Sequence, residues 1–124
     1  MINRHCLDTY ALWEIHLGNE KYHFFSDEEG FVISNWTLIE FYRTLLRQFN
    51  QQTADYWLKK LKPFCEEVDL DILAHAAVFQ HEHHKKRISL FDAVGYCFSQ
   101  SKGYTFVTGD KEFEQFKGVL FIKK

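Results

Sequence analysis

The stretch YTFVTGDKEF, residues 104–113, decides the fold that this sequence predicts. Its first five residues are β-branched or aromatic, the composition of a strand. Gly109 ends that strand, and Asp110 follows directly. In an open parallel sheet, ligands bind in the crevice at the carboxyl ends of the strands. We therefore expect Asp110 to lie where a ligand would bind.

Outward from this stretch, predicted strands and helices alternate along the chain. Strands are expected up to Leu7 and over 31–33, 64–68, 104–108 and 119–122. Helices are expected over 10–15, 35–49, 51–61, 70–84, 92–100 and 111–116. Pro63 and Gly103 mark two helix ends, and Asn35 is a candidate N-cap. The alternation predicts an α/β fold with a largely parallel sheet, in one domain over residues 1–124.

Apolar spacing indicates which side of two helices faces the core. For the helix 35–49 these residues are Trp36, Ile39, Leu46 and Phe49. For the helix 70–84 they are Leu70, Leu73, Ala74, Ala77 and Val78.

Composition narrows the class of protein. The sequence is 46% hydrophobic and 18% aromatic, which favours a packed interior over disorder. No apolar run approaches the ~20 residues that span a bilayer, and the first residues lack the apolar core of a signal peptide, so we expect a cytoplasmic protein without a membrane partner. A net charge of −2 excludes binding nucleic acid through bulk positive charge alone. A nuclease that neutralises phosphate with divalent cations remains possible.

The cysteines Cys6, Cys65 and Cys97 are odd in number and far apart in the sequence. Each has apolar neighbours, and the sequence contains no CxxC pair. We therefore expect three reduced cysteines that pack in the interior, without a disulfide framework or a metal knuckle.

Three further carboxylates stand out beside Asp110. Asp8 immediately follows the first predicted strand, and Glu40 and Asp92 each interrupt an apolar helical stretch. Taken singly, Asp92 and Asp110 could be helix N-caps and Glu40 an exposed helical residue. Burying a carboxylate costs several kcal/mol or more unless a partner compensates, however, and Mg²⁺ and Mn²⁺ take oxygen ligands. Four acids together therefore favour a shared metal site of the kind that hydrolyses phosphodiesters.

At four places the sequence resembles the PIN-domain nucleases. The matching segments are Leu7-Asp8-Thr9, TLIE at 37–40, LFDA at 90–93 and FVTGDKEF at 106–113. Their order and spacing fit the family, and the last segment is the most specific. The resemblance covers essentially the whole chain, which has the size of the free-standing VapC-like toxins of toxin–antitoxin pairs.

This resemblance implies a five-stranded parallel sheet with helices on both faces. It also implies that Asp8, Glu40, Asp92 and Asp110 form an acidic cluster for one or two Mg²⁺ or Mn²⁺ ions, with Thr108 supporting the last acid. The implied activity is hydrolysis of RNA by water that the metal activates. The implied partners are RNA, a neutralising antitoxin and a second copy of the chain in a homodimer.

The first motif departs from the family in two ways. Asn3, Arg4 and His5 make the first strand polar, and Tyr10 stands where a small or amide residue commonly follows the Asp-Thr pair. Near the metals, Tyr10 would narrow the pocket or stack on a base. Substrate choice is therefore the property most affected.

The most polar stretch runs from His81 to Arg87. His81 and His84 are one turn apart, which suits a transition metal, but a solvated helix end is the favoured interpretation. We retain RNA contact by Lys85, Lys86 and Arg87 as a hypothesis. A separate set is a candidate dimer or antitoxin surface: Trp13, Tyr22, His23, Phe24 and Phe25.

Other functions fit less well. A haloacid-dehalogenase-like phosphatase would need a second Asp where Tyr10 stands, and a receiver domain would need an acidic pair at the first strand and a late Lys. The alternative that we retain is a PIN fold that binds RNA or protein and cleaves poorly or not at all. The presence of all four acids argues against it.

Overall fold

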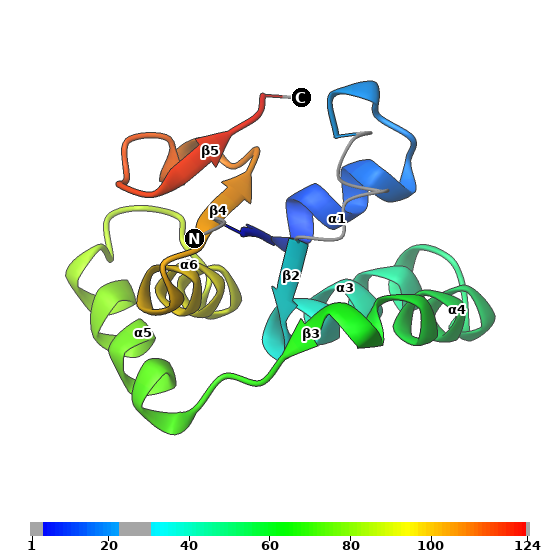
Figure 1. The fold of residues 1–124 in the computed structure, drawn as a ribbon, viewed down its shortest axis with the longest axis horizontal. Coiled ribbons are helices and arrows are strands. Elements are labelled where there is room, and N and C mark those ends of the chain that lie inside the picture. The colour runs from blue at the N-terminus through cyan, green and yellow to red at the C-terminus, as the bar shows by residue number, and fades with distance from the viewer. Residues whose placement is uncertain (1–3, 23–30, 124) are drawn as a thin grey trace.

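Five parallel strands form one sheet in the order β3-β2-β1-β4-β5, as the computed structural model shows for residues 4–22 and 31–123 (Figure 1). The strands are β1 (His5–Leu7), β2 (Phe31–Ser34), β3 (Cys65–Glu66), β4 (Thr105–Thr108) and β5 (Val119–Phe121). The expected five-stranded parallel sheet is therefore confirmed. The third strand is shorter than the predicted span 64–68.

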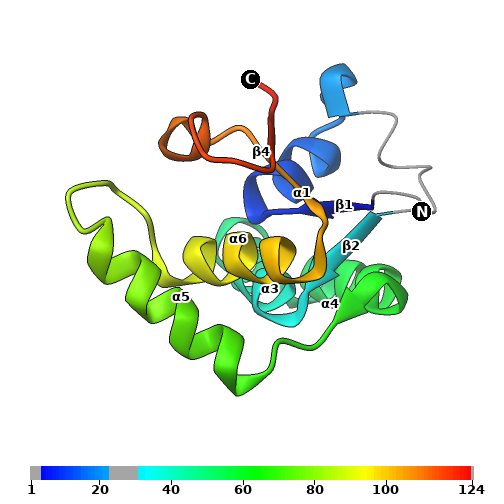
Figure 2. The same ribbon diagram turned by 60° about the vertical axis from the view of Figure 1, so that its left-hand side comes forward.

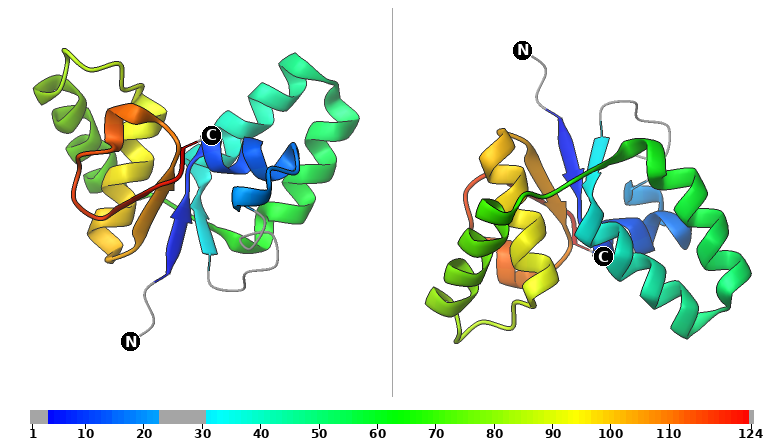
Figure 3. Two further views of the ribbon diagram at one scale, coloured as in Figure 1. Left: turned by 90° about the horizontal axis from the view of Figure 1, so that it is seen from above. Right: turned by 90° about the horizontal axis from the view of Figure 1, so that it is seen from below.

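Helices cover both faces of this sheet. They are α1 (Thr9–His16), α3 (Asn35–Gln48), α4 (Gln51–Leu61), α5 (Leu70–Glu82) and α6 (Leu90–Lys102), with short 3₁₀ turns η1 (Glu20–Tyr22), η2 (Lys62–Phe64) and η3 (Lys111–Phe113). Figure 3 shows α1, α3 and α4 on one side of the strands and α5 with α6 on the other. The α/β class with two helical layers is confirmed.

Alternation along the strands explains why two cores form. Leu7, Ile33 and Val107 pack with α1, α3 and α4, whereas their neighbours Val32 and Phe106 pack with α5 and α6. Successive side chains of a strand point to opposite faces, so the central strands β1, β2 and β4 each contribute to both cores. A sheet buried on both faces needs apolar residues at consecutive positions, as in Phe31-Val32-Ile33.

The order of the strands fixes where a crevice forms. The chain adds β2 and β3 on one side of β1 and then returns to place β4 on the other side. Strand order therefore reverses between β1 and β4, and such a switch point is where open α/β sheets bind ligands. The pair Leu7 and Val107 lie in register there, and the Asp8 N–H donates to the Val107 carbonyl at 3.2 Å.

At two helix starts the capping residue differs from the candidate that the sequence offered. The cap of α3 is Ser34, not Asn35, because the Ser34 hydroxyl accepts a hydrogen bond from the Thr37 N–H at 3.0 Å. Asn35 is the first helical residue. The late helix begins at Leu90, two residues before the predicted start, because Ser89 caps it. At its other end, Gly103 (φ 72°) is the predicted cap, since glycine adopts this left-handed conformation without strain.

The apolar faces predicted for two helices were wrong in part. Helix α3 buries Leu38, Phe41 and Leu45, whereas Ile39, Leu46 and Phe49 are exposed. Helix α5 leaves Leu70 78% and Val78 53% exposed; it packs through Ala76, with Ile72, Leu73 and Phe79 partly buried. Both helices carry apolar residues on more than one side, so spacing alone does not identify the buried side.

Two smaller expectations can be compared directly. The predicted helix 111–116 is only the 3₁₀ turn η3. Cys6, Cys65 and Cys97 are free thiols, as expected. Among the described residues, no helix combines the length and the apolar character needed to cross a membrane.

Candidate active site

A cleft of about 620 Å³ opens beside the carboxyl ends of β1 and β4, and all four predicted acids line it. The lining residues are Asp8, Thr9, Tyr10, Glu40, Thr44, Arg87, Asp92, Gly109, Asp110, Lys111 and Glu112. The acids come from four separate segments, two from strand ends and two from the helices α3 and α6. The structure therefore brings these side chains to one cleft at the switch point.

Asp8 lies at the base of this cleft, with 3% of its surface exposed. It caps α1, because its Oδ1 accepts a hydrogen bond from the Ala11 N–H at 2.8 Å. Burial raises the pKa of Asp8 well above its ordinary 3.8, and the nearby charges of Asp92 and Asp110 raise it further. Hydrogen bonds from Thr108 and Ala11 oppose the rise. The Asp8 carboxylate is thus held firmly but is poorly compensated for its charge.

The side chain of Thr108 connects Asp8 to the backbone of Asp110. Its side chain is fully buried, and its hydroxyl is hydrogen-bonded to the Asp8 carboxyl. The same hydroxyl oxygen accepts a hydrogen bond from the Asp110 N–H at 3.0 Å. Because the hydroxyl can donate once and accept at the same time, it fixes Asp8 and the backbone of Asp110 relative to each other.

Asp110 also caps a local turn. Its Oδ1 accepts a hydrogen bond from the Glu112 N–H at 3.0 Å, at the start of η3. The capping interpretation of Asp110 is therefore correct, and the structure adds the same role for Asp8. A carboxylate has two oxygens with several lone pairs, so a cap leaves acceptor capacity toward the cleft.

Glu40 reaches the cleft from α3 and is oriented by α1. The Thr9 hydroxyl donates a hydrogen bond to Glu40 Oε1. Glu40 is half-buried, so the interpretation as a fully exposed helical residue does not hold. Thr9 is a site residue that sequence reasoning missed, although its place directly after Asp8 was the available signal.

Asp92 stands in the first turn of α6 and is not the cap of that helix. The Ser89 hydroxyl accepts a hydrogen bond from the Asp92 N–H at 3.1 Å, and the Asp92 carboxyl accepts one from the Ser89 backbone. This reciprocal pair is a capping box. Burial raises the pKa of Asp92 from 3.8 to about 7, and the charges of Glu40 and Asp110 contribute to the rise. Asp92 is therefore part of an acidic group whose members repel one another.

The donor chemistry of this group suits a hard divalent cation. All four predicted ligands offer carboxylate oxygens. Burial, and to a smaller extent mutual repulsion, raise the pKa values of Asp8 and Asp92, and a positive charge among the acids would offset both effects. Among the described residues, no three His, Cys, Asp or Glu side chains are gathered closely enough to form a ligand set as they stand. The carboxylates thus share a cleft without being drawn together on one point.

Tyr10 forms one wall of the cleft by lying against Gly109. A Cβ added to Gly109 would collide with the Tyr10 ring, so only glycine leaves room for it. The expectation that Tyr10 narrows the pocket agrees with this contact. Burial raises the Tyr10 pKa, and Glu14, Asp8 and Asp110 raise it further.

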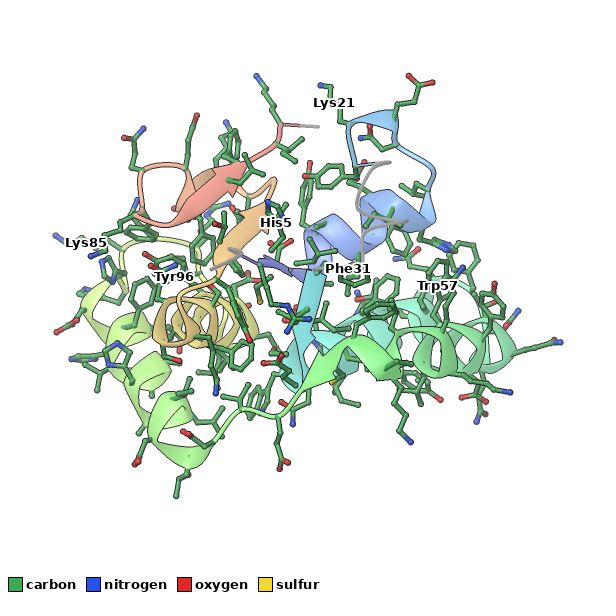
Figure 4. All side chains as sticks on the ribbon, in the orientation of Figure 1. His5, Lys21, Phe31, Trp57, Lys85 and Tyr96 are labelled. Carbon is green, nitrogen blue, oxygen red and sulfur yellow. The ribbon has the colours of Figure 1, made fainter. Side chains whose placement is uncertain are left out.

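The structure separates the three cations in which RNA contact was expected. Arg87 lines the cleft, but Lys85 and Lys86 do not. Figure 4 shows Lys85 at the outer edge of the molecule, pointing away from the sheet. Lys86 instead lies 4.0 Å from Glu112. Sequence reasoning did not single out Lys111 and Glu112, the other charged residues of the lining, although they follow Asp110 directly.

Of the other surface features, the solvated helix end favoured for His81 and His84 agrees with the structure, and the aromatic surface is contradicted at Tyr22. His81 and His84 are both exposed, and their ring centroids are 6.3 Å apart. Within the part of the chain that the structure describes, they belong to no metal-binding group. In the aromatic set, Tyr22 is fully buried and Trp13 is partly buried against the core, so the prediction that they form a surface was wrong for Tyr22. His23, Phe24 and Phe25 lie outside the described residues.

Known proteins with a similar sequence pattern or a similar fold were found in two of three comparisons. The family model of the PIN domain matches residues 5–119. VapC20 of Mycobacterium tuberculosis, a toxin that cleaves the sarcin–ricin loop, is 20% identical with a TM-score of 0.75 over 93% of this chain and 98% of that one. DNA-bound VapBC from Salmonella typhimurium is 18% identical with a TM-score of 0.75 over 98% of each chain. A toxin–antitoxin complex from Klebsiella pneumoniae is 19% identical with a TM-score of 0.72 over 93% and 94%. Curated proteins give no match to the sequence.

Proposed function

This chain belongs to the PIN domain family, and we propose that it is a divalent-metal-dependent endoribonuclease that hydrolyses RNA in the cleft beside β1 and β4. One observation carries the proposal. Asp8, Glu40, Asp92 and Asp110, from four separate segments, line the same cleft at the switch point of the sheet. Helix capping accounts for single acids, but it gives no reason for four of them to share one cleft.

In the proposed site, Asp8, Glu40, Asp92 and Asp110 would hold Mg²⁺ or Mn²⁺. Bound there, such an ion supplies Lewis acidity, a lowered pKa of water and positive charge toward the phosphate. The protein contributes orientation. Thr108 fixes Asp8 relative to Asp110, and Thr9 directs the Glu40 carboxylate.

The remaining residues shape the space around the acids. The Tyr10 ring, seated on Gly109, limits the width of the cleft beside Asp110. A wall of this kind restricts how a nucleotide can approach the acids. No side-chain nucleophile is required, since phosphodiester hydrolysis proceeds by in-line attack of water.

We also infer that the protein acts as the toxin of a toxin–antitoxin pair. Structural relatives include VapBC complexes from Salmonella typhimurium, Haemophilus influenzae and Rickettsia felis. On this proposal a neutralising antitoxin is the protein partner and the toxin is a homodimer. Light scattering of the purified protein, alone and co-expressed with the product of an adjacent short reading frame, tests both partners.

The activity is tested with purified protein and structured RNAs, with Mg²⁺ or Mn²⁺ and with a chelator. Asp8→Asn keeps the oxygen that caps α1, and Asp92→Asn keeps an oxygen that can accept the hydrogen bond from Ser89. Both variants are therefore expected to fold and to lose metal-dependent cleavage. Asp71→Asn is the matched control, because Asp71 is exposed on α5 and outside the cleft. Undiminished cleavage by either site variant would overturn the assignment. RNA binding without cleavage by the wild type would favour the alternative, a PIN fold that serves as a binding module.

A further inference from the structure

The loop between α5 and α6, residues 83–89, holds an arginine at the edge of the acidic cleft. Figure 2 shows the two helices side by side with this loop joining them. Of the loop's cations, Arg87 lines the cleft. The side chains on either side of Arg87 have other contacts. Lys86 lies near Glu112 and over the Phe116 ring, and Ile88 is buried in the core.

The backbone around Arg87 is fixed by its neighbours. The Lys86 N–H donates to the His83 carbonyl at 2.9 Å, and Gln80 Nε2 donates to the Ile88 carbonyl at 2.9 Å. Ser89 then caps α6. Because the backbone is anchored on both sides of Arg87, the position of its Cα is fixed. The fold therefore places the Arg87 side chain at the cleft.

No residue of the described part of the chain pairs with the Arg87 guanidinium. Within residues 4–22 and 31–123, Arg87 makes no ion pair or hydrogen bond, although five carboxylates line the same cleft. The ion pairs of the described residues are Arg4 with Glu66 and Lys86 with Glu112. An arginine beside acids that it does not pair with is available for an anion from solution.

The negative charge of the cleft explains why a cation that binds phosphate is needed there. Among the described residues, the cleft is lined by five carboxylates and by two cations, Arg87 and Lys111. The chain as a whole has a net charge of −2, so it provides no bulk attraction for a polyanion. Metal ions would neutralise the acids, but a strand of several phosphates also needs contacts away from the reacting one. Arginine suits this task, because its planar fork binds phosphate oxygens in pairs.

We propose that Arg87 binds a backbone phosphate of the RNA strand and thereby sets the strand's position over the acids. This inference rests on the proposed ribonuclease function. It assigns to Arg87 a role that Lys85 and Lys86 do not share, because Lys85 is not part of the cleft lining and Lys86 is paired with Glu112.

The first test measures RNA binding without cleavage. In the Asp92→Asn background, fluorescence anisotropy with a short labelled single-stranded RNA compares Arg87→Ala, Arg87→Lys and the control Lys85→Ala. Arg87→Ala is expected to weaken binding about tenfold, the effect of one charge-assisted contact. It should also reduce the slope of log affinity against log salt by about 0.7, the effect of one phosphate contact on a single strand. Arg87→Lys should keep the slope and recover part of the affinity, and Lys85→Ala should match the parent.

The second test measures cleavage in the otherwise wild-type protein with Mn²⁺. Arg87→Ala is expected to raise KM more than it lowers kcat, while its dependence on Mn²⁺ concentration stays that of the wild type. Circular dichroism confirms folding of each variant. If the wild type cleaves RNA and Arg87→Ala equals Lys85→Ala in both tests, the inference about Arg87 is wrong while the proposed function stands. If the wild type cleaves no RNA, the proposed function itself fails.

Discussion

The charge of Asp92 is expected to destabilise the fold when no metal is bound. Its pKa is raised to about 7 by burial and by the charges of Glu40 and Asp110. Asp92→Asn removes the charge while keeping an oxygen that can still accept the hydrogen bond from the Ser89 backbone. In the presence of a chelator, the variant should therefore be more stable than the wild type at neutral pH. A gain in stability with a loss of function is a recurrent property of active sites.

The size of the effect follows from the two pKa values of this carboxyl group. Between pH 3.8, the ordinary value, and about 7, the folded protein retains a proton that the unfolded chain has released. The free energy of unfolding therefore falls as pH rises through that window. At 1.36 kcal/mol per pKa unit, the cost of the Asp92 charge is about 1 kcal/mol near pH 4.5 and at most about 4 kcal/mol above pH 8. The stability gain of Asp92→Asn should show the same rise with pH.

Urea unfolding of wild type and variant at several pH values, followed by circular dichroism, measures this difference. Asp71→Asn is the control, because exposed Asp71 should give no pH-dependent difference. Added Mn²⁺ should stabilise the wild type and not Asp92→Asn, since only a ligand that binds the folded state raises stability. A stability difference that does not change between pH 4.5 and pH 8 would refute the account of Asp92 as a repelled carboxylate.

Three other substitutions have expected outcomes. Gly109→Ala should lower RNA cleavage, because the added Cβ would push the Tyr10 ring into the cleft, and a second substitution, Tyr10→Ala, should restore part of the activity. Unchanged cleavage kinetics of Gly109→Ala alone would contradict the contact between Tyr10 and Gly109. Leu45→Ala removes a fully buried side chain and should lower the unfolding free energy by about 2–5 kcal/mol in urea, whereas a loss well below this would place Leu45 outside the core. Gly103→Ala forces a left-handed conformation on alanine and should cost about 1 kcal/mol in the same assay, with Gly103→Asn costing less.

The sequence predicted the elements around the cleft well, because their signals are local. The β-branched and aromatic run 104–108 predicts a strand, Gly109 predicts its end, and Asp110 follows directly. Asp8 and Asp110 were expected at strand ends, and both are there. Strand positions of this kind depend on a few consecutive residues, so a single sequence is enough to find them.

Which side of a helix faces the core could not be predicted in the same way. Leu38 and Ile39 are adjacent on α3 and equally apolar, yet Leu38 is buried and Ile39 is exposed. The choice depends on which helices and strands pack against α3, and that is a property of the whole fold. Helix caps were missed for a different reason: Ser34 and Asn35 are both good caps by type, and only the backbone conformation decides between them.

The cleft contains residues whose roles the sequence did not show. Thr9 directs Glu40 across a sequence separation of 31, a distance that spacing along the chain cannot show. The three neighbouring cations of the loop were indistinguishable in the sequence, but Arg87 lines the cleft with the acids, whereas Lys85 lies at the outer edge of the molecule.

The caps made by Asp8 and Asp110 affect how a protein of this kind could lose its activity in evolution. Selection for folding preserves an oxygen at each position, because α1 and η3 begin there. Asparagine supplies that oxygen as well as aspartate does. Selection for stability therefore keeps the shape of the cleft without keeping its charge. A lineage released from the need to cut RNA can exchange acid for amide and retain an intact fold, open to use as a binding protein.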